Sequence, residues 1–208
     1  VGSEMCIRDS NNFVYDFLYP NPASVLAFIE NHDTDRFLGE GNNLPMLKQA
    51  STLLLTTRRI PQLYYGTEVM MNGVKSKSDG YVRKDFPGGW TGDATNALTP
   101  AGRTKIQNEC YDFYKTILNW RKGNDVIAKG SMVQFMVQNG VYAYARQYEG
   151  KTIFVMLNGT DAETTVPLKF YKEILKDSKQ GKDILSGKAI TFGEELKMGP
   201  RESLVIEL

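Results

Sequence analysis

The pattern of hydrophobic and polar positions changes along this 208-residue chain, and its first part alternates short apolar runs with a helical repeat. Residues 25–30 (VLAFIE) form a nearly continuous apolar run, which is typical of a strand buried on both faces of a parallel sheet. Residues 60–65 (IPQLYY) form a second such run. Between them, residues 44–57 repeat apolar positions every three or four residues, which predicts an amphipathic helix.

Local signals give boundaries to the helices. Asn43 can cap the first helix and Pro45 lies in its first turn. Because a strand, a helix and a strand follow in this order, we expect a βαβ unit with a parallel strand pair. A polar loop over residues 71–98 follows, and a second helix is expected to begin with Thr99 as its N-cap and to stop at Gly123.

After about residue 127 the hydrophobic period changes from helical to alternating. Asn139-Gly140 lies between two alternating runs and is a strong signal for a two-residue hairpin. Four further strand candidates follow: residues 152–157, 164–168, 189–192 and 204–208. Short strands at regular spacing predict a small antiparallel sandwich. We therefore divide the chain into an α/β region over residues 11–127 and an all-β domain over residues 128–208, and residues 1–10 stay unassigned.

Composition narrows the classes of function. Hydrophobic residues make up 41% of the chain and the formal net charge is +1, so nothing favours a nucleic acid or an anionic membrane as partner. No apolar run is long enough to span a membrane. The two cysteines, Cys6 and Cys110, cannot form a disulfide framework, and Cys110 is expected to be a small buried hydrophobe on the second helix.

A dense polar cluster follows the first apolar strand. Asn31, His32 and Asp33 come directly after residues 25–30, and His32 is the single histidine of the chain. Barrel enzymes keep their reacting groups at the carboxyl ends of buried parallel strands. The position of this cluster therefore predicts that the Asp33 carboxylate faces a cleft.

Four segments together resemble glycoside hydrolase family 13, the α-amylase family. Residues 22–37 (PASVLAFIENHDTDRF) are similar to its fourth signature segment, and residues 60–68 (IPQLYYGTE) to its eighth barrel strand. Residues 79–90 (DGYVRKDFPGGW) resemble the following loop in neopullulanases, cyclomaltodextrinases and Bacteroidetes amylases. Residues 151–160 (KTIFVMLNGT) resemble the trailing β-domain of these enzymes, so the resemblance extends from about Asn12 to Leu208.

The resemblance implies a role for each matching residue. Asp33 matches the aspartate that stabilises the transition state, and His32 matches a histidine that hydrogen-bonds the sugar. Arg36 matches an arginine beside the site with a supporting role, and we group it with the substrate-binding residues. Further matches are the substrate-facing Asp85 and Trp90 and the supporting residues Asn31, Tyr64, Tyr65 and Glu68.

The fold that the resemblance implies is the last two strand–helix units of a (β/α)8 barrel followed by a small antiparallel β-sandwich. A complete barrel needs about 250 residues, so the nucleophile and the acid/base carboxylate would lie upstream. The expected parent is a retaining hydrolase of α-glucans such as starch, maltooligosaccharides, pullulan or cyclodextrins. The chain alone is expected to be inactive, and to expose apolar side chains that the upstream part covers.

Several alternatives stay open. The same carboxylates serve transglycosylation and isomerisation, and some proteins of this superfamily are non-catalytic interaction proteins. Arg59 replaces the glycine that usually precedes Ile-Pro in the family. No residue set has convincing metal-ligand spacing, so no cofactor is identified, although calcium is possible in the parent. An α-glucan oligosaccharide is the expected partner, the oligomeric state is open, and the resemblance favours the bacterial periplasm or the outside of the cell.

Overall fold

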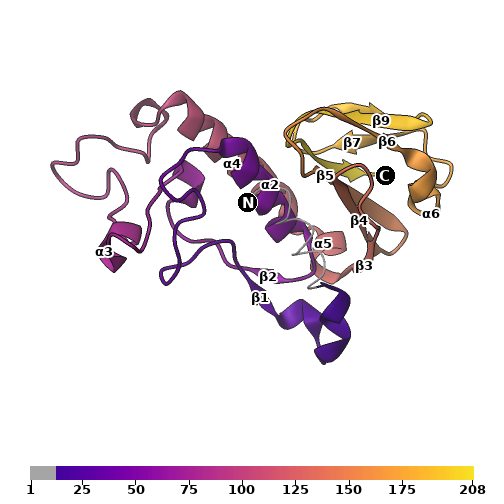
Figure 1. Cartoon of the computed structure of the whole chain (residues 1–208), viewed down its shortest axis with the longest axis horizontal. Helices are drawn as coiled ribbons and strands as arrows, with labels where there is room; N and C mark the ends of the chain where they lie inside the picture. The colour runs from indigo at the N-terminus through magenta and orange to yellow at the C-terminus, as the bar shows by residue number, and fades with distance from the viewer. Residues whose placement is uncertain (1–12) are drawn as a thin grey trace.

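The computed structural model describes residues 13–208. The unassigned residues 1–10 and Cys6 lie outside this range. The described chain forms two neighbouring regions, in which a mixed α/β region packs against a β-domain (Figure 1). The helices are α2 (Leu44–Thr56), α3 (Asp79–Val82), α4 (Lys105–Arg121), α5 (Asp125–Lys129) and α6 (Lys172–Leu175).

The expected βαβ unit is present, but its strands are short. Strand β1 (Leu26–Ala27) pairs in parallel with β2 (Ile60–Pro61), and helix α2 lies between them in sequence. The prediction that these strands are buried on both faces is wrong for this chain, because Leu26 is 53% exposed and Ile60 is 50% exposed. Within residues 13–208, β1 and β2 have no further strand neighbours and close no barrel.

Arg59 ties the segment before β1 to the segment before β2. Its guanidinium pairs with the buried Asp16 carboxylate and donates to the carbonyl of Pro22 at 2.8 Å. Arg58 adds a second ion pair to Asp16 at 2.5 Å. The arginine that departs from the family pattern therefore has a structural partner in this chain.

The two long helices begin at side-chain caps. Asn43 Oδ1 accepts a hydrogen bond from the backbone N–H of Met46 at 3.1 Å, as the predicted N-cap of α2 requires. The predicted start of the second helix was wrong, because Thr99 caps only a 3-10 turn. Helix α4 begins after Thr104, which forms a capping box with Gln107 and so satisfies two backbone donors at once.

The β-domain contains two antiparallel sheets. The larger sheet has the order β3-β4-β5-β10-β7-β8, and the smaller one pairs β6 with β9. The predicted hairpin is present, with φ of 50° at Asn139 and 78° at Gly140, the positive pair that a two-residue turn needs. The strands are β3 (Ser131–Gln134), β4 (Val141–Tyr148), β5 (Lys151–Asn158), β6 (Thr164–Pro167), β7 (Gln180–Asp183), β8 (Ala189–Thr191), β9 (Glu195–Met198) and β10 (Ser203–Glu207).

Alternate side chains of the larger sheet enter two different cores. Ala143 and Ala145 of β4 face the smaller sheet and helix α6, whereas Tyr142 and Tyr144 face helices α2 and α4. The Tyr144 hydroxyl hydrogen-bonds the Thr56 hydroxyl at the end of α2. The β-domain is therefore a sandwich, and the outer face of its larger sheet also packs against helices α2 and α4.

Arg146 fastens the junction between the two regions. Its buried guanidinium donates to the carbonyls of Thr56 at 2.9 Å, Ile127 at 2.9 Å and Gly130 at 2.8 Å. Burial lowers the pKa of Arg146 to about 10, so the side chain is still cationic at neutral pH. The positive charge lies at the carbonyl ends of α2 and α5, where the helix dipole favours it.

Candidate functional site

The turn that follows β1 carries the predicted Asn31-His32-Asp33 cluster. The Asn31 side chain accepts a hydrogen bond from the backbone N–H of Asp33 at 2.8 Å, and the Thr34 hydroxyl accepts one from the N–H of Asn31 at 3.0 Å. Such local side-chain bonds hold the backbone in a tight turn. The side chains of His32 and Asp33 consequently point outward, with exposed fractions of 59% and 62%.

Asp33 is paired on both carboxylate oxygens. His32 Nε2 lies 3.1 Å from Oδ2, and Arg83 Nη2 lies 3.1 Å from Oδ1. Arg83 Nε also donates to the carbonyl of His32 at 2.9 Å. The ammonium group of Lys75 donates to the Asp33 carbonyl at 3.0 Å. The structure therefore places an exposed carboxylate, with a charged or ionisable partner at each oxygen, in the turn that follows the parallel strand β1.

Arg83 and Lys75 were not identified by the sequence analysis. Arg83 lies in the family-like segment 79–90, and Asp79, four residues earlier, accepts a hydrogen bond from Arg83 at 3.1 Å. That spacing on the short helix α3 was an available signal, since residues four apart share a helix face. Exposed ion pairs of this kind are screened by water, so they contribute little to stability. They do define where the Arg83 guanidinium lies relative to Asp79 and Asp33.

Arg36 does not face the open site. Its side chain is 1% exposed and donates to Glu30 Oε1, to the Tyr65 carbonyl at 2.7 Å and to the Val82 carbonyl at 3.0 Å. In this structure its guanidinium is buried among protein groups, so its grouping with the substrate-binding residues stays a prediction. Its contacts fit the supporting role.

Tyr64 and Tyr65 form the wall beside Arg36. Their rings meet edge to face with centroids 4.7 Å apart, and the Arg36 guanidinium lies 4.0 Å from the Tyr64 ring centroid. Burial, together with a hydrogen bond to Tyr65, raises the pKa of Tyr64 above its ordinary value. Gly66 follows with φ of 82°, where a Cβ would also collide with Met71, so the glycine is required for the chain to turn after Tyr65.

The remaining predicted residues lie in the 3-10 turn after Gly66 and in the long loop. Glu68 is half-buried in the 3-10 turn Thr67–Val69. Asp85 and Trp90 lie in the long loop with exposed side chains, and Trp90 is 68% exposed. Asp93 accepts from the N–H of Trp90 at 3.1 Å and so closes the tip of the loop. Within the described chain, no hydrogen bond or ion pair joins Asp85 or Trp90 to Asp33.

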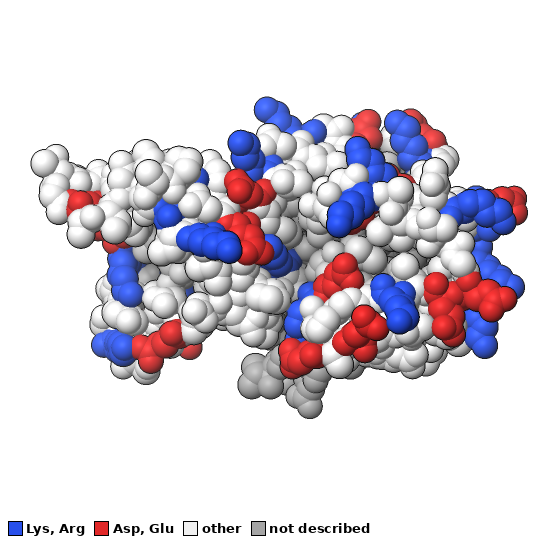
Figure 2. All heavy atoms as spheres, turned by 90° about the horizontal axis from the view of Figure 1, so that it is seen from above, with Lys and Arg blue, Asp and Glu red and all other residues white. Residues whose placement is uncertain are grey.

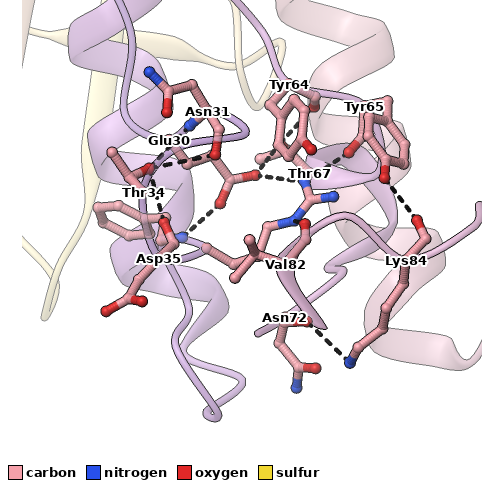
Figure 3. Close-up of polar contacts among 12 residues, drawn as sticks. Glu30, Asn31, Thr34, Asp35, Tyr64, Tyr65, Thr67, Asn72, Val82 and Lys84 are labelled. Carbon is pink, nitrogen blue, oxygen red and sulfur yellow. Dashed lines mark hydrogen bonds and ion pairs between the residues drawn. The ribbon is translucent and has the colours of Figure 1, made fainter. Parts of the chain in front are cut away.

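Glu30 is a buried acid that the sequence analysis left unassigned. Its carboxylate accepts hydrogen bonds from Arg36, from the hydroxyl of Thr67 and from the backbone N–H of Phe37 (Figure 3). A glutamate at the end of an apolar run was the available signal, because a buried carboxylate needs partners.

The surface of the molecule carries charges of both signs. Acidic and basic side chains are intermixed on the face seen in Figure 2, and more of them lie over the β-domain than over the loop-bearing end. In residues 13–208, no three acidic, histidine or cysteine side chains are grouped as metal ligands, and no helix is long and apolar enough to cross a membrane. The mixed charge agrees with the balanced composition.

The β-domain matches the model of a described protein family. Residues 132–207 match the cyclo-malto-dextrinase C-terminal domain. The match starts one residue after the beginning of β3 and ends at the last residue of β10. It therefore covers both sheets of the sandwich.

Over most of its length the chain is similar to an α-amylase and to a cyclomaltodextrin glucanotransferase. The α-amylase of Niallia circulans is 30% identical over 81% of this chain and 29% of its own length. The cyclomaltodextrin glucanotransferase of Thermoanaerobacterium thermosulfurigenes is 31% identical over 85% of this chain and 25% of its own length. The chain thus spans between a quarter and a third of the length of these two relatives.

A solved structure shares the fold. The α-amylase of Geobacillus thermoleovorans, crystallised with acarbose, aligns with a TM-score of 0.72 at 23% identity, over 94% of this chain and 42% of that one. The arrangement of both regions, and not only the β-domain, therefore recurs in an amylase structure.

Proposed function

We propose that this chain is the C-terminal part of a retaining α-glucan hydrolase of the α-amylase family. In this proposal, β1 and β2 with their helices are the last two strand–helix units of a (β/α)8 barrel. The observation that carries the proposal is the exposed Asp33 carboxylate, presented by a rigid turn after a parallel strand and flanked by His32. The α-amylase of Niallia circulans supports it through the activity that its name states.

The proposed chemistry follows from the charge that develops on the sugar. A retaining glycosidase uses a nucleophile and an acid/base about 5–5.5 Å apart, and its sugar passes through an oxocarbenium-like state. Asp33 is proposed to accept hydrogen bonds from the ring hydroxyls, which strengthen as positive charge appears, and His32 is proposed as a second hydrogen-bonding group. Trp90 would offer a flat apolar face to a neighbouring glucose.

The nucleophile and the acid/base carboxylate are proposed to lie in the preceding part of the protein. The chain covers 29% of the length of the α-amylase and 25% of that of the glucanotransferase. Within residues 13–208, the groups paired with the Asp33 carboxylate are His32 and Arg83, and neither is an acid. The isolated chain is therefore proposed to have no glycosidase activity. A release of reducing ends from maltooligosaccharides by the purified 208-residue chain would contradict this assignment.

The test of Asp33 uses the longer protein and two variants. Asp33→Asn should lower kcat by on the order of 10²–10³-fold, the usual loss when one preorganised electrostatic group is removed from a transition state. Asp35→Asn is the matched control, since Asp35 is also an exposed acid of the same turn but accepts from the backbone of Lys75. A similar loss in both variants, or in neither, would refute the assignment of Asp33.

Transglycosylation is the second candidate, because one of the two relatives is a cyclomaltodextrin glucanotransferase. Both reactions pass through the same glycosyl-enzyme and differ only in whether water or a sugar hydroxyl completes the reaction. Product analysis with maltotetraose separates them. Products mainly longer than maltotetraose, or cyclic products, would replace hydrolase by transferase, and a protein without either activity would favour the non-catalytic interaction role.

A further inference from the structure

We propose that Glu30, Arg36 and Tyr65 are positioning residues that together aim the guanidinium of Arg83 at Asp33. The geometry of this device is independent of the enzyme class. Its catalytic meaning rests on the proposed function, since only there does the placement of Asp33 decide a rate.

The first part of the device is a buried ion pair that closes the Asp33 turn. Glu30 is 2% exposed, and its Oε1 lies 3.2 Å from Arg36 Nη1. Its other oxygen accepts from the N–H of Phe37, so one carboxylate joins the beginning and the end of the segment that carries His32 and Asp33. Removing one member of such a pair leaves an unpaired buried charge, so both side chains hold each other in place.

The second part fixes the backbone on both sides of Arg83. Arg36 Nε donates to the carbonyl of Val82 at 3.0 Å, and the Tyr65 hydroxyl donates to the carbonyl of Lys84 at 2.6 Å. The contact between Tyr65 and Lys84 is drawn as a dashed line in Figure 3. Arg83 is therefore the middle residue of a segment whose neighbouring carbonyls are both held by site residues.

The third part is the exposed side chain of Arg83, whose neighbouring backbone carbonyls are held by these two hydrogen bonds. Arg83 reaches the His32 carbonyl at 2.9 Å and Asp33 Oδ1 at 3.1 Å, although both ends of the contact are exposed. An exposed arginine with a free backbone would sample many rotamers, and its ion pair would contribute little. Arg36 contacts both Glu30, which closes the turn that carries Asp33, and the carbonyl of Val82, which precedes Arg83. Arg83 and Asp33 therefore meet at a defined distance although both side chains are exposed.

The chain offers a direct reporter of this geometry. His32 is its one histidine, so the imidazole signal in a ¹H–¹³C spectrum needs no further assignment. In the ligand-free 208-residue chain, Glu30→Gln and Tyr65→Phe should each move the His32 signal toward its position in Arg83→Gln. The matched controls are Glu40→Gln, at an exposed acid paired with Lys77, and Tyr111→Phe, on helix α4. Both controls should leave the His32 signal in place.

The coupling between residues is the decisive measurement. Arg83→Gln should move the His32 signal less than half as far in a Glu30→Gln background as it does in the otherwise unchanged chain. The reason is that Glu30→Gln has already displaced the Arg83 side chain from Asp33. Fully additive shifts would overturn the proposal. The indole N–H of Trp120, which donates to Glu207 at 2.7 Å, reports the β-domain junction and should not move.

Two outcomes distinguish a failure of this proposal from misfolding of a variant and from a failure of the proposed function. If Glu30→Gln loses the Trp120 signal, Tyr65→Phe decides, since it removes one hydroxyl at a partly exposed position; an unmoved His32 signal there overturns the proposal. The measurements contain no sugar. An inactive longer protein would therefore contradict the proposed function but not the positioning role of Glu30, Arg36 and Tyr65. Additive shifts would contradict the positioning role but not the proposed function.

Discussion

Two apolar segments of similar character end in very different surroundings. Residues 153–158 lie in β5, which has β4 on one side and β10 on the other, and they are completely buried. Residues 25–30 lie around β1, whose one neighbour in the described chain is β2, and Leu26 and Phe28 are exposed there. The difference shows that an apolar run specifies a strand, while the number of its neighbours decides whether the strand is long and buried.

The sharpest way to test this contrast is to remove one phenylalanine from each region. Phe154→Ala in β5 should cost about 3–5 kcal/mol of unfolding free energy, because it leaves a cavity in a closed core. Phe28→Ala beside β1 should cost less than about 1 kcal/mol, since its side chain is already partly in water. Urea denaturation of both variants measures the difference, and equal losses would refute the contrast.

The junction between the regions should be the next most sensitive place. Arg146→Met should cost about 2–4 kcal/mol, because it leaves the buried carbonyls of Thr56, Ile127 and Gly130 without their charged donor. Arg146→Lys keeps the charge but not the fork, so it should recover only part of the loss. Thermal unfolding followed by calorimetry gives both values. Full recovery by lysine would mean that charge alone matters here.

Cys110 gives a smaller, pH-dependent effect in the α/β region. Burial raises the pKa of its thiol to about 12. The folded chain therefore keeps this proton above the pH at which the unfolded chain loses it, and stability falls as pH rises from about 8.5 towards 12. In a Cys6→Ser background, Cys110→Ala should remove about 1 kcal/mol of the stability difference between pH 7 and pH 9.5. The same pH dependence with and without the thiol would contradict this.

The smallest effect on stability should come from the exposed strand pair. Leu26→Ser with Ile60→Ser should change the unfolding free energy by no more than about 0.5 kcal/mol per site, because both side chains are about half exposed. Exposed apolar patches promote association, so the double variant should instead reduce self-association in sedimentation velocity. A large destabilisation would mean that this face is better packed than the exposure of these side chains indicates.

The sequence determined the elements whose signals are local. Helix α2 begins after Asn43 as predicted, the hairpin turns at Asn139-Gly140, and Cys110 is buried on α4. Capping side chains and positive-φ residues act over a few positions, so their effect does not depend on distant neighbours. The missed strands β7 and β9 contain glycine or charged residues, and pairing with β10 and β6 forms them.

The candidate site divides in the same way. The turn that exposes His32 and Asp33 is held by Asn31 and Thr34, which are local contacts that the sequence order alone could place. The burial of Arg36 and the meeting of Arg83 with Asp33 join residues 46 and 50 positions apart. Only the tertiary fold could decide those contacts, because side chains that far apart in the chain meet only after the backbone has packed.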